Sequence, residues 1–166
     1  MMKKIIWVPV ILLVGGVVFW MYQTSGDDAS ASAPENSGRS SDKEKVEIVM
    51  NRGEYCQCCV KWADYLEENG FRVIDRTVNN LLDIKSDNHV SSDLVSCHTA
   101  KIDGYVVEGH VPSNEIRRLI SEQPDAAGIA VPGMPMGSPG MDSFSSDPYD
   151  VILFDENGNK SVFAQY

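Results

Sequence analysis

The chain of 166 residues carries 24 acidic and 14 basic side chains, which gives a formal net charge of -10 at pH 7. This charge argues against nucleic acid as a partner, because phosphate binding requires a basic face. Once a noncore N-terminal segment is set aside, roughly 120 residues remain, enough for a single core, so we expect one domain and a monomer. The four cysteines are too few and too clustered for a disulfide-stapled scaffold, and they indicate a site instead.

The first 45 residues have the pattern of a membrane-targeting segment followed by a linker. Lysines precede an uncharged apolar run over residues 5–22, which is about as long as a membrane-spanning helix. Lysines on that side place the N-terminus in the cytoplasm and export the rest of the chain. We therefore expect an anchor over residues 1–23 and a disordered tether over residues 24–45, which are rich in Ser, Ala, Asp and Gly. Small residues at 29–31 leave a cleaved signal peptide open as the alternative.

Three cysteines lie where a strand should give way to a helix. Residues 46–50 form an apolar run suited to a buried strand, and the run ends at the turn signal Asn51-Arg52-Gly53. Apolar residues then recur at helical spacing from Cys59 onward, and Gly70 marks the expected end of that helix. The cysteines at this junction are Cys56, Cys58 and Cys59.

This position favours thiolate chemistry. Unpaired N–H groups and the dipole of a helix N-terminus favour negative charge, so a thiol there loses its proton more readily than a free cysteine. Cys56 and Cys59 form a C-x-x-C pair between a strand and a helix, the redox arrangement of thioredoxin-like domains. We expect these two to be the catalytic thiols, with Cys56 the more exposed and reactive. Cys58 has no role in a pure dithiol exchanger, whereas a site for thiophilic ions gains from a third sulfur. Three buried small residues, or a structural disulfide with a spare thiol, remain the alternative.

The next segments complete a βαβ unit. Residues 71–78 alternate apolar and polar side chains, which predicts a second strand, parallel to the first and reached by a right-handed crossover. Residues 79–90 predict a short helix, with His89 at its end as a surface residue. The apolar residues of that helix are Leu81, Leu82 and Ile84.

A hairpin and a third helix follow. Asp103-Gly104 between two apolar runs favours a tight turn and predicts a hairpin or a strand with a bulge. Pro112 lies near the start of the helix, and we expect Ser113 or Asn114 to cap it. Its predicted buried face consists of Ile116, Leu119 and Ile120.

These segments also carry a second group of ligand-type residues. Cys97 stands beside His98 ahead of the hairpin, and His110 falls just before the N-terminus of the third helix. A buried core histidine bonded by the backbone remains open for each histidine. The neighbouring cysteine and glycine favour a site instead.

Residues 127–142 form a loop rich in proline, glycine and methionine. Its prolines and glycines exclude a periodic helix or strand that would absorb Met134, Met136 and Met141 into a core face. Thioether sulfur is a weak ligand selective for soft ions, above all Cu(I). The alternative is that the methionines fill apolar gaps beneath a rigid loop.

The last segment predicts a C-terminal hairpin. Residues 151–154 and 161–166 are apolar runs separated by a turn that contains Asn157-Gly158. The fold class is therefore α/β, with a thioredoxin-like mixed sheet of four or more strands flanked by helices. A Pro/Gly/Met-rich extension and the C-terminal hairpin belong to the same domain, over residues 46–166.

The ligand types together select copper. Ligands of a βαβ sheet lie beyond the carboxyl ends of its parallel strands, so we expect the cysteines, histidines and methionine loop to converge there. Four cysteines can also make a closed zinc site, but here Cys97 stands alone beside a histidine rather than in a second C-x-x-C pair. Thiolate, imidazole and thioether in one chain favour copper over zinc, and bridging thiolates can hold more than one Cu(I) ion.

Four motifs in this order resemble the CopG-type copper-resistance proteins of Gram-negative bacteria, over residues 46–166. They are C-x-C-C followed by Trp62, then Ser96 to Ala100, Gly104 to Pro112, and Ala130 to Met141. The resemblance implies a periplasmic thioredoxin-like domain whose C-terminal extension helps to bind copper, with a redox role in copper detoxification. The site it implies consists of Cys56, Cys58, Cys59, Cys97, His98, His110 and the methionine loop with Met134 and Met136.

The leading prediction is a periplasmic copper-binding oxidoreductase that interconverts Cu(I) and Cu(II) while its cysteines pass between dithiol and disulfide. Its expected partners are copper ions, a copper efflux system or a periplasmic redox partner, and the inner membrane through residues 5–22. Two rivals remain open: a non-catalytic Cu(I) carrier or buffer, and a thiol-disulfide exchanger for other proteins. The carrier predicts no copper turnover, and the exchanger predicts full function without His98, His110 or the methionines.

Overall fold

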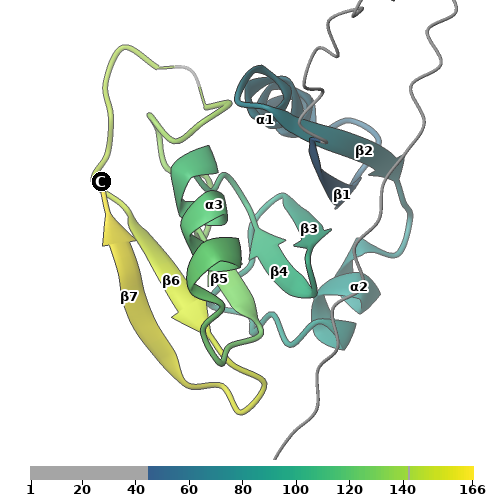
Figure 1. Cartoon of the computed structure of the whole chain (residues 1–166). Helices are drawn as coiled ribbons and strands as arrows, with labels where there is room; N and C mark the ends of the chain where they lie inside the picture. The colour runs from purple at the N-terminus through teal and green to yellow at the C-terminus, as the bar shows by residue number, and fades with distance from the viewer. Residues whose placement is uncertain (1–44, 142) are drawn as a thin grey trace, which may run out of the picture. The chain divides into compact units, whose positions relative to one another are not determined.

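The computed structural model describes residues 45–141 and 143–166 of the chain (Figure 1). The predicted anchor, and all but the last residue of the predicted tether, lie outside the described residues. Within the described part of the chain, no helix combines the length and apolar character needed to cross a membrane.

The chain begins its described part with the predicted βαβ unit. Strand β1 (Val46–Arg52) leads into helix α1 (Gln57–Glu68), and β2 (Phe71–Thr77) returns parallel to β1. Gly70 has φ +80°, a left-handed conformation that glycine adopts without strain, and this residue turns the chain from α1 into β2. β1 runs two residues past the predicted end, because Asn51 and Arg52 still pair with neighbouring strands.

The predicted hairpin is confirmed. β3 (His98–Ile102) pairs antiparallel with β1 on one side and with β4 (Tyr105–Glu108) on the other. Asp103 and Gly104 form the turn, with φ of 48° and 84°. Positive φ at both central residues is the geometry that an Asp-Gly hairpin turn provides.

Helix α3 (Ser113–Glu122) begins earlier than predicted. Its N-cap is Pro112, so the prediction of Ser113 or Asn114 as cap is wrong: both lie inside the helix. The Ser113 N–H donates to the hydroxyl oxygen of Tyr65 at 3.1 Å. A side chain from α1 therefore accepts the bond that a capping side chain would have accepted.

The loop predicted over residues 127–142 contains one short strand, β5 (Gly128–Ala130). β5 pairs parallel with β4 and antiparallel with β6 (Asp150–Phe154), and β6 pairs with β7 (Lys160–Gln165) as the predicted C-terminal hairpin. β5 ends before the three methionines, so the prediction that no helix or strand absorbs Met134, Met136 and Met141 is confirmed. The seven strands lie in the order β2-β1-β3-β4-β5-β6-β7, which confirms the mixed α/β class.

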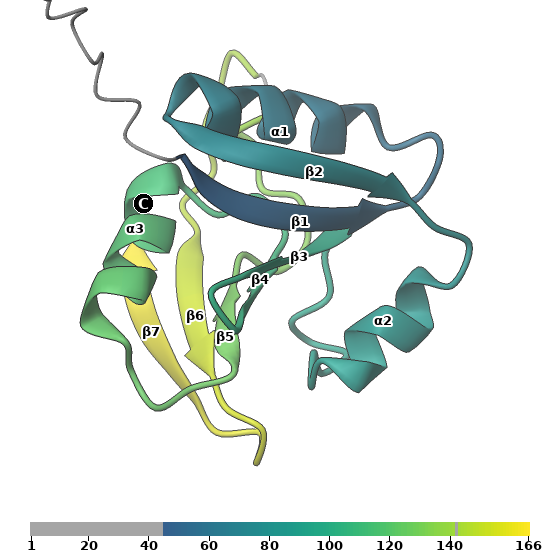
Figure 2. The same ribbon diagram turned by 45° about the vertical axis from the view of Figure 1, so that its right-hand side comes forward.

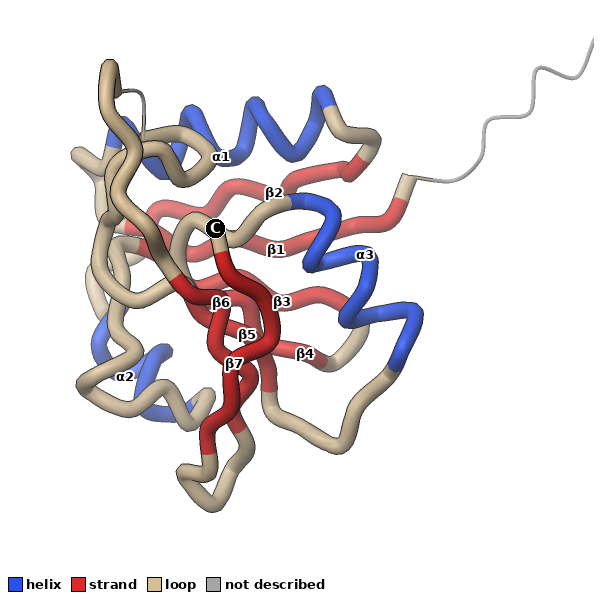
Figure 3. The backbone as a smooth tube through the Cα atoms, turned by 90° about the vertical axis from the view of Figure 1, so that its left-hand side faces the viewer, coloured by secondary structure: helices blue, strands red, loops and turns tan. Residues whose placement is uncertain are grey.

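Two cores lie on opposite faces of the sheet. On β4, Val107 belongs to the larger core with α1 and α3, whereas its neighbour Val106 belongs to a smaller core. Adjacent strand residues point to opposite faces, so α1 and α3 cover one face and the chain around α2 (Leu81–Asp87) covers the other. Figures 2 and 3 show α2 on the far side of the strands from α3. The predicted short helix is confirmed as α2, and His89 after it is exposed, as predicted.

Candidate metal centre

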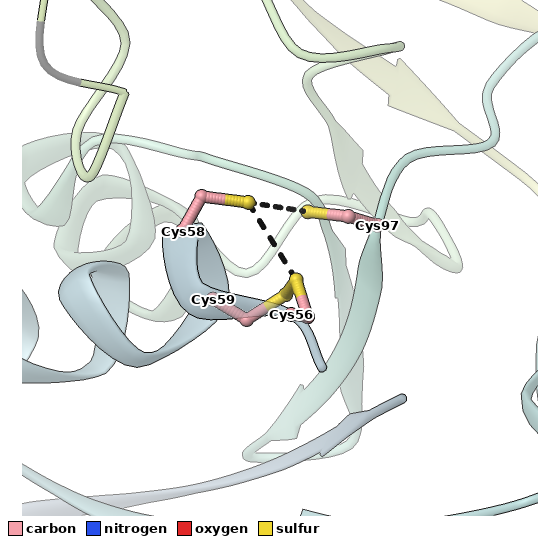
Figure 4. A group of neighbouring side chains, drawn as sticks. All are labelled: Cys56, Cys58, Cys59 and Cys97. Carbon is pink, nitrogen blue, oxygen red and sulfur yellow. Dashed lines mark hydrogen bonds between the residues drawn. A yellow bond between two sulfur atoms is a disulfide. The ribbon is translucent and has the colours of Figure 1, made fainter. Parts of the chain in front are cut away.

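Four sulfur atoms meet between the start of α1 and the start of β3. Cys56 and Cys59 form a disulfide, with their Cα atoms 5.4 Å apart, while Cys58 and Cys97 are free thiols. The Cys58 Sγ lies 3.6 Å from the Cys56 Sγ and 3.9 Å from the Cys97 Sγ (Figure 4). The expected convergence of Cys97 with the first cysteine group is therefore present, although 39 positions separate Cys58 from Cys97.

The local sequence explains how α1 presents three cysteines to one place. Cys56 is the N-cap of α1, and Cys58 and Cys59 lie in its first turn. Cys59 points into the core and is fully buried, whereas Cys56 and Cys58 are partly exposed. This exposure agrees with the expectation that Cys56 is the more accessible thiol of the C-x-x-C pair. The N–H groups of this first helical turn favour negative charge on the sulfurs.

Two buried imidazoles flank the Cys97 thiol. Its Sγ lies 2.9 Å from the His110 Nε2 and 3.4 Å from the His98 Nδ1. The His110 Nδ1 lies 2.8 Å from the Pro139 carbonyl oxygen. A carbonyl oxygen only accepts hydrogen bonds, so the Nδ1 must carry the proton, and the Nε2 of the neutral ring faces Cys97 with a free lone pair. That lone pair accepts a thiol proton or binds a metal ion.

His98 has a ring nitrogen without a hydrogen-bond partner among the described residues, the buried Nε2. Its ring lies against the indole of Trp62, with centroids 4.3 Å apart, and the Trp62 Nε1 donates to the Val111 carbonyl oxygen at 2.9 Å. An unpaired buried polar atom costs about 1–3 kcal/mol. His98 is therefore not a fully satisfied core histidine, and its other ring nitrogen, Nδ1, is the one that faces the Cys97 thiol.

Burial controls the protonation of the candidate nitrogen and sulfur ligands. Burial lowers the pKa of His98 well below its usual value, and the nearby His110 and Lys85 add to this effect. Burial also lowers the pKa of His110. Burial raises the pKa of Cys97 to about 12, with a further contribution from Cys58. At neutral pH the site therefore holds two neutral imidazoles and a Cys97 thiol that donates to the His110 Nε2, and a metal ion that binds the sulfur displaces this proton.

Residues 127–142 reach the site through their backbone. Gly140 packs on the first turns of α1 so closely that a Cβ there would lie 2.7 Å from the Trp62 N and 2.9 Å from the Cys58 O. This packing holds the adjacent Pro139 carbonyl against His110. Sequence reasoning missed Pro139 and Gly140, because both contribute through the backbone and not through a distinctive side chain. Positive φ at Gly140, 82°, is the property that a Pro-Gly pair signals in a sequence.

The two methionines predicted as ligands lie at the surface. Met134 is 54% exposed and Met136 is 43% exposed, while Met141 is half-buried. Unlike the two buried histidines, Met134 and Met136 are not buried against the sulfur cluster. Metal binding by Met134 and Met136 therefore stays a prediction.

The cysteines and histidines that come together offer two overlapping ligand groups. Within each group the ligand atoms lie within 4.8 Å of one another. One group is all sulfur (Cys56, Cys58, Cys59 and Cys97), and the other joins sulfur to nitrogen (Cys97, His98 and His110). Cys97 belongs to both. Sulfur favours Cu(I), whereas imidazole binds copper in both oxidation states.

Comparisons with known proteins agree with this chemistry. Residues 94–141 match a family described as "Protein of unknown function, DUF411". Two solved structures of copper resistance protein CopG, named form 1 and form 2, are each 44% identical to this chain with a TM-score of 0.71. Each alignment covers 74% of this chain, and 98% and 99% of the two solved chains respectively. A comparison with curated proteins finds no match.

Proposed function

Because the chain belongs to the CopG family of copper-resistance proteins, we propose that it binds copper in the periplasm and interconverts Cu(I) and Cu(II). The observation that carries this proposal is the position of Cys97, whose Sγ lies 3.9 Å from a free thiol and 2.9 Å from an imidazole nitrogen. A copper ion at Cys97 can therefore reach sulfur ligands on one side and nitrogen ligands on the other.

The redox state of the Cys56–Cys59 pair determines which ligands copper meets. With this disulfide formed, the free ligands are two thiols and two imidazoles: Cys58, Cys97, His98 and His110. This mixed set accepts Cu(II) as well as Cu(I). When the disulfide is reduced, four thiolates become available, and such a set strongly favours Cu(I). Each copper oxidation state thus has a matching state of the protein.

The electron balance follows from this coupling. Two Cu(II) ions take up one electron each and become Cu(I), while two thiolates lose one electron each and form the Cys56–Cys59 disulfide. In the opposite direction, two Cu(I) ions deliver the two electrons that open the disulfide and leave as Cu(II). The order of elements supports a thioredoxin-like framework for this exchange. A strand leads into α1 with C-x-x-C at its start, and β2, the β3-β4 hairpin and α3 follow.

The test is an anaerobic titration of the fully reduced full chain with Cu(II). Cu(I) is measured with a colorimetric Cu(I) chelator, and free thiols are counted in parallel. We expect one Cu(I) to appear for each thiol lost, up to two, with the Cys56–Cys59 disulfide identified by peptide mass. Cu(II) that binds without any loss of thiols would contradict the redox step.

The two rival functions are distinguished by the same titration for one and by a disulfide-reduction assay for the other. A Cu(I) carrier binds Cu(I) tightly and leaves its thiol count unchanged on addition of Cu(II). A thiol-disulfide exchanger reduces a mixed-disulfide substrate at the same rate in a His98→Ala/His110→Ala variant as in the wild type. The two buried imidazoles beside Cys97 favour the copper reaction, because dithiol exchange requires neither.

The proposed cellular setting follows from the sequence outside the described residues. An apolar run over residues 5–22 after two lysines supports attachment to the inner membrane, with the domain in the periplasm. There the protein would meet copper, an efflux system and a redox partner. Alkaline carbonate washing of membranes from cells expressing the full chain tests the anchor: we expect the protein to stay with the pellet, and its release at a shortened mature size would indicate a cleaved signal peptide.

A further inference from the structure

Helix α2 buries a lysine while it exposes a leucine. Lys85 is 3% exposed, whereas Leu82, in the same helix, is 75% exposed. The apolar residues of the sequence pattern would have predicted the reverse. The helix is therefore oriented by a polar contact, and Lys85 must have a specific partner in the interior.

That partner is Glu108 at the end of β4, which is fully buried. The Glu108 Oε1 accepts from the Lys85 Nζ at 2.5 Å and from the Ser96 N–H at 2.7 Å. The Glu108 Oε2 accepts from the Thr99 hydroxyl at 2.7 Å, and the Lys85 Nζ donates to the same hydroxyl oxygen at 3.0 Å. The Glu108 carboxylate thus accepts hydrogen bonds from Lys85, Ser96 and Thr99, and none of these three residues belongs to β4.

Two of these donors, Ser96 and Thr99, flank the site residues Cys97 and His98 in the sequence. Ser96 immediately precedes Cys97, and Thr99 immediately follows His98. Thr99 and Glu108 are register partners on β3 and β4, and adjacent strand residues point to opposite faces of the sheet. The ion pair therefore lies beneath the sheet, opposite the His98 ring, and holds the Cys97-His98 dipeptide from both ends.

The same dipeptide is tied to the loop that supports His110. The Ser96 hydroxyl donates to the Gly133 carbonyl oxygen, and Ser96 and Gly133 form an isolated parallel bridge. Gly109, with φ +75°, packs so tightly that a Cβ there would meet the Ser96 side chain and the Val131 carbonyl oxygen. The position of Ser96, which Glu108 fixes, therefore also limits where His110 can lie.

We propose that the buried Lys85–Glu108 pair is the positioning element of the copper site, which holds Cys97 and His98 where they meet Cys58 and His110. This inference rests on the proposed function for its copper readout, but the position of the Cys97 thiol can be measured without copper. A buried ion pair is weak support for stability, because apolar residues of similar size replace such pairs at little cost or with a gain. Its place beneath the site is explained by the geometry that it imposes on residues 96–99.

The experiment compares the full-length wild type with Lys85→Met/Glu108→Gln, which removes both charges and keeps the side-chain volumes. Three quantities are measured: Cu(I) affinity by chelator competition, urea unfolding, and the alkylation rate of Cys97 in the copper-free protein, followed by peptide mass. The matched control is Lys160→Met/Asp93→Asn, which removes an ion pair of similar length, 2.6 Å, at a partly exposed position.

We expect Cu(I) affinity to fall about 10- to 100-fold in Lys85→Met/Glu108→Gln, the range seen when groups that orient metal ligands are lost. We also expect Cys97 alkylation to accelerate at least several-fold at an unchanged unfolding midpoint, because the thiol leaves its contact with His110. The control should match the wild type in both. Wild-type alkylation and wild-type affinity in the folded double variant would overturn the proposal.

The proposal can still be tested if the double variant does not fold or if the wild type binds no Cu(I). If the double variant does not fold, Thr99→Val replaces it: this variant keeps both charges and removes the hydroxyl that links them to β3. Faster Cys97 alkylation in folded Thr99→Val supports positioning, and an unchanged rate overturns it. If the wild type binds no Cu(I), the proposed function fails, while the alkylation comparison still decides whether the ion pair positions Cys97.

Discussion

Residues 46–70 and residues 94–141 contribute to the same site in different ways. The first region delivers three cysteines from one helix start, where the local sequence alone sets their spacing. The second region delivers Cys97, two histidines and a supporting loop, and their meeting depends on β3, β4 and the chain after β5 being in register. A ligand group made within one helical turn is insensitive to packing elsewhere, whereas one assembled from distant segments depends on many contacts.

This difference predicts how sensitive each half of the site is to change. In the α1 group, Cys58 has sulfur neighbours at 3.6 Å and 3.9 Å, so other sulfurs remain nearby when one is lost. Cys97 has no such replacement, because it belongs to both ligand groups. The copper affinity should therefore respond most strongly to changes in residues 94–141.

The largest effect is expected from Cys97→Ser. Oxygen is a poor ligand for soft Cu(I), and this change removes the one atom common to the sulfur and nitrogen groups. We expect Cu(I) affinity, measured by chelator competition, to fall more than about 100-fold, beyond the effect of losing an orienting group. Cys58→Ser is the matched control, which should lower copper stoichiometry while thiol exchange at Cys56 and Cys59 continues. Equal losses in the two variants would remove the distinction between the regions.

Sequence reasoning succeeded where one segment carries its own signal. The parallel β1-α1-β2 unit, the Asp103-Gly104 turn and the C-terminal hairpin have local patterns, and the structure confirms each. The cysteines and histidines were also recognised, because their residue types limit the chemistry they can perform. The meeting of Cys58 with Cys97 was an expectation from strand topology, and the structure contains it.

The contacts that orient these ligands carry no such signal. The Pro139 carbonyl acts through its backbone, which every residue type possesses, so no sequence pattern marks it. No sequence pattern marks Lys85 as a buried residue, and only three-dimensional packing places it against Glu108. The Tyr65 hydroxyl that replaces a helix cap for α3 comes from 48 positions away. In each case the partner is distant along the chain, so propensity and periodicity cannot reveal it.

The second largest effect concerns the docking of the loop on α1. Gly140→Ala places a Cβ 2.7 Å from the Trp62 N at a residue with φ +82°. We expect a loss of about 1–3 kcal/mol in the free energy of unfolding, together with weaker copper binding as His110 loses the Pro139 carbonyl. Gly158→Ala is the control, since it shares the positive φ, 84°, but has open space around it. Similar losses in both variants would mean that backbone strain alone, and not the contact with α1, is responsible.

A further effect is expected from pH. Burial lowers the pKa values of His98 and His110, so the folded protein keeps both rings neutral where the unfolded chain is already protonated. The unfolded chain then binds more protons, and stability present above about pH 6.5 is lost as the pH falls, with a slope of up to about 1.4 kcal/mol per pH unit for each histidine. Urea unfolding between pH 7.5 and 5 measures this. The slope should be shallower in His110→Asn, and an unchanged slope would show that His110 does not contribute.

The smallest effect is expected from the methionine loop. Met134 and Met136 are exposed, so thioether binding there competes with water and adds little to a site that already holds thiolates. Met134→Leu/Met136→Leu keeps the side-chain volumes, and we expect it to lower Cu(I) affinity by less than about tenfold, or about 1.4 kcal/mol, without changing thiol reactivity. Chelator competition gives the affinity, and stopped-flow transfer from a Cu(I) chelator shows whether uptake slows instead. A loss as large as that of Cys97→Ser would mean that copper draws the loop inward, and the two methionines would then rank with the buried ligands of residues 94–141.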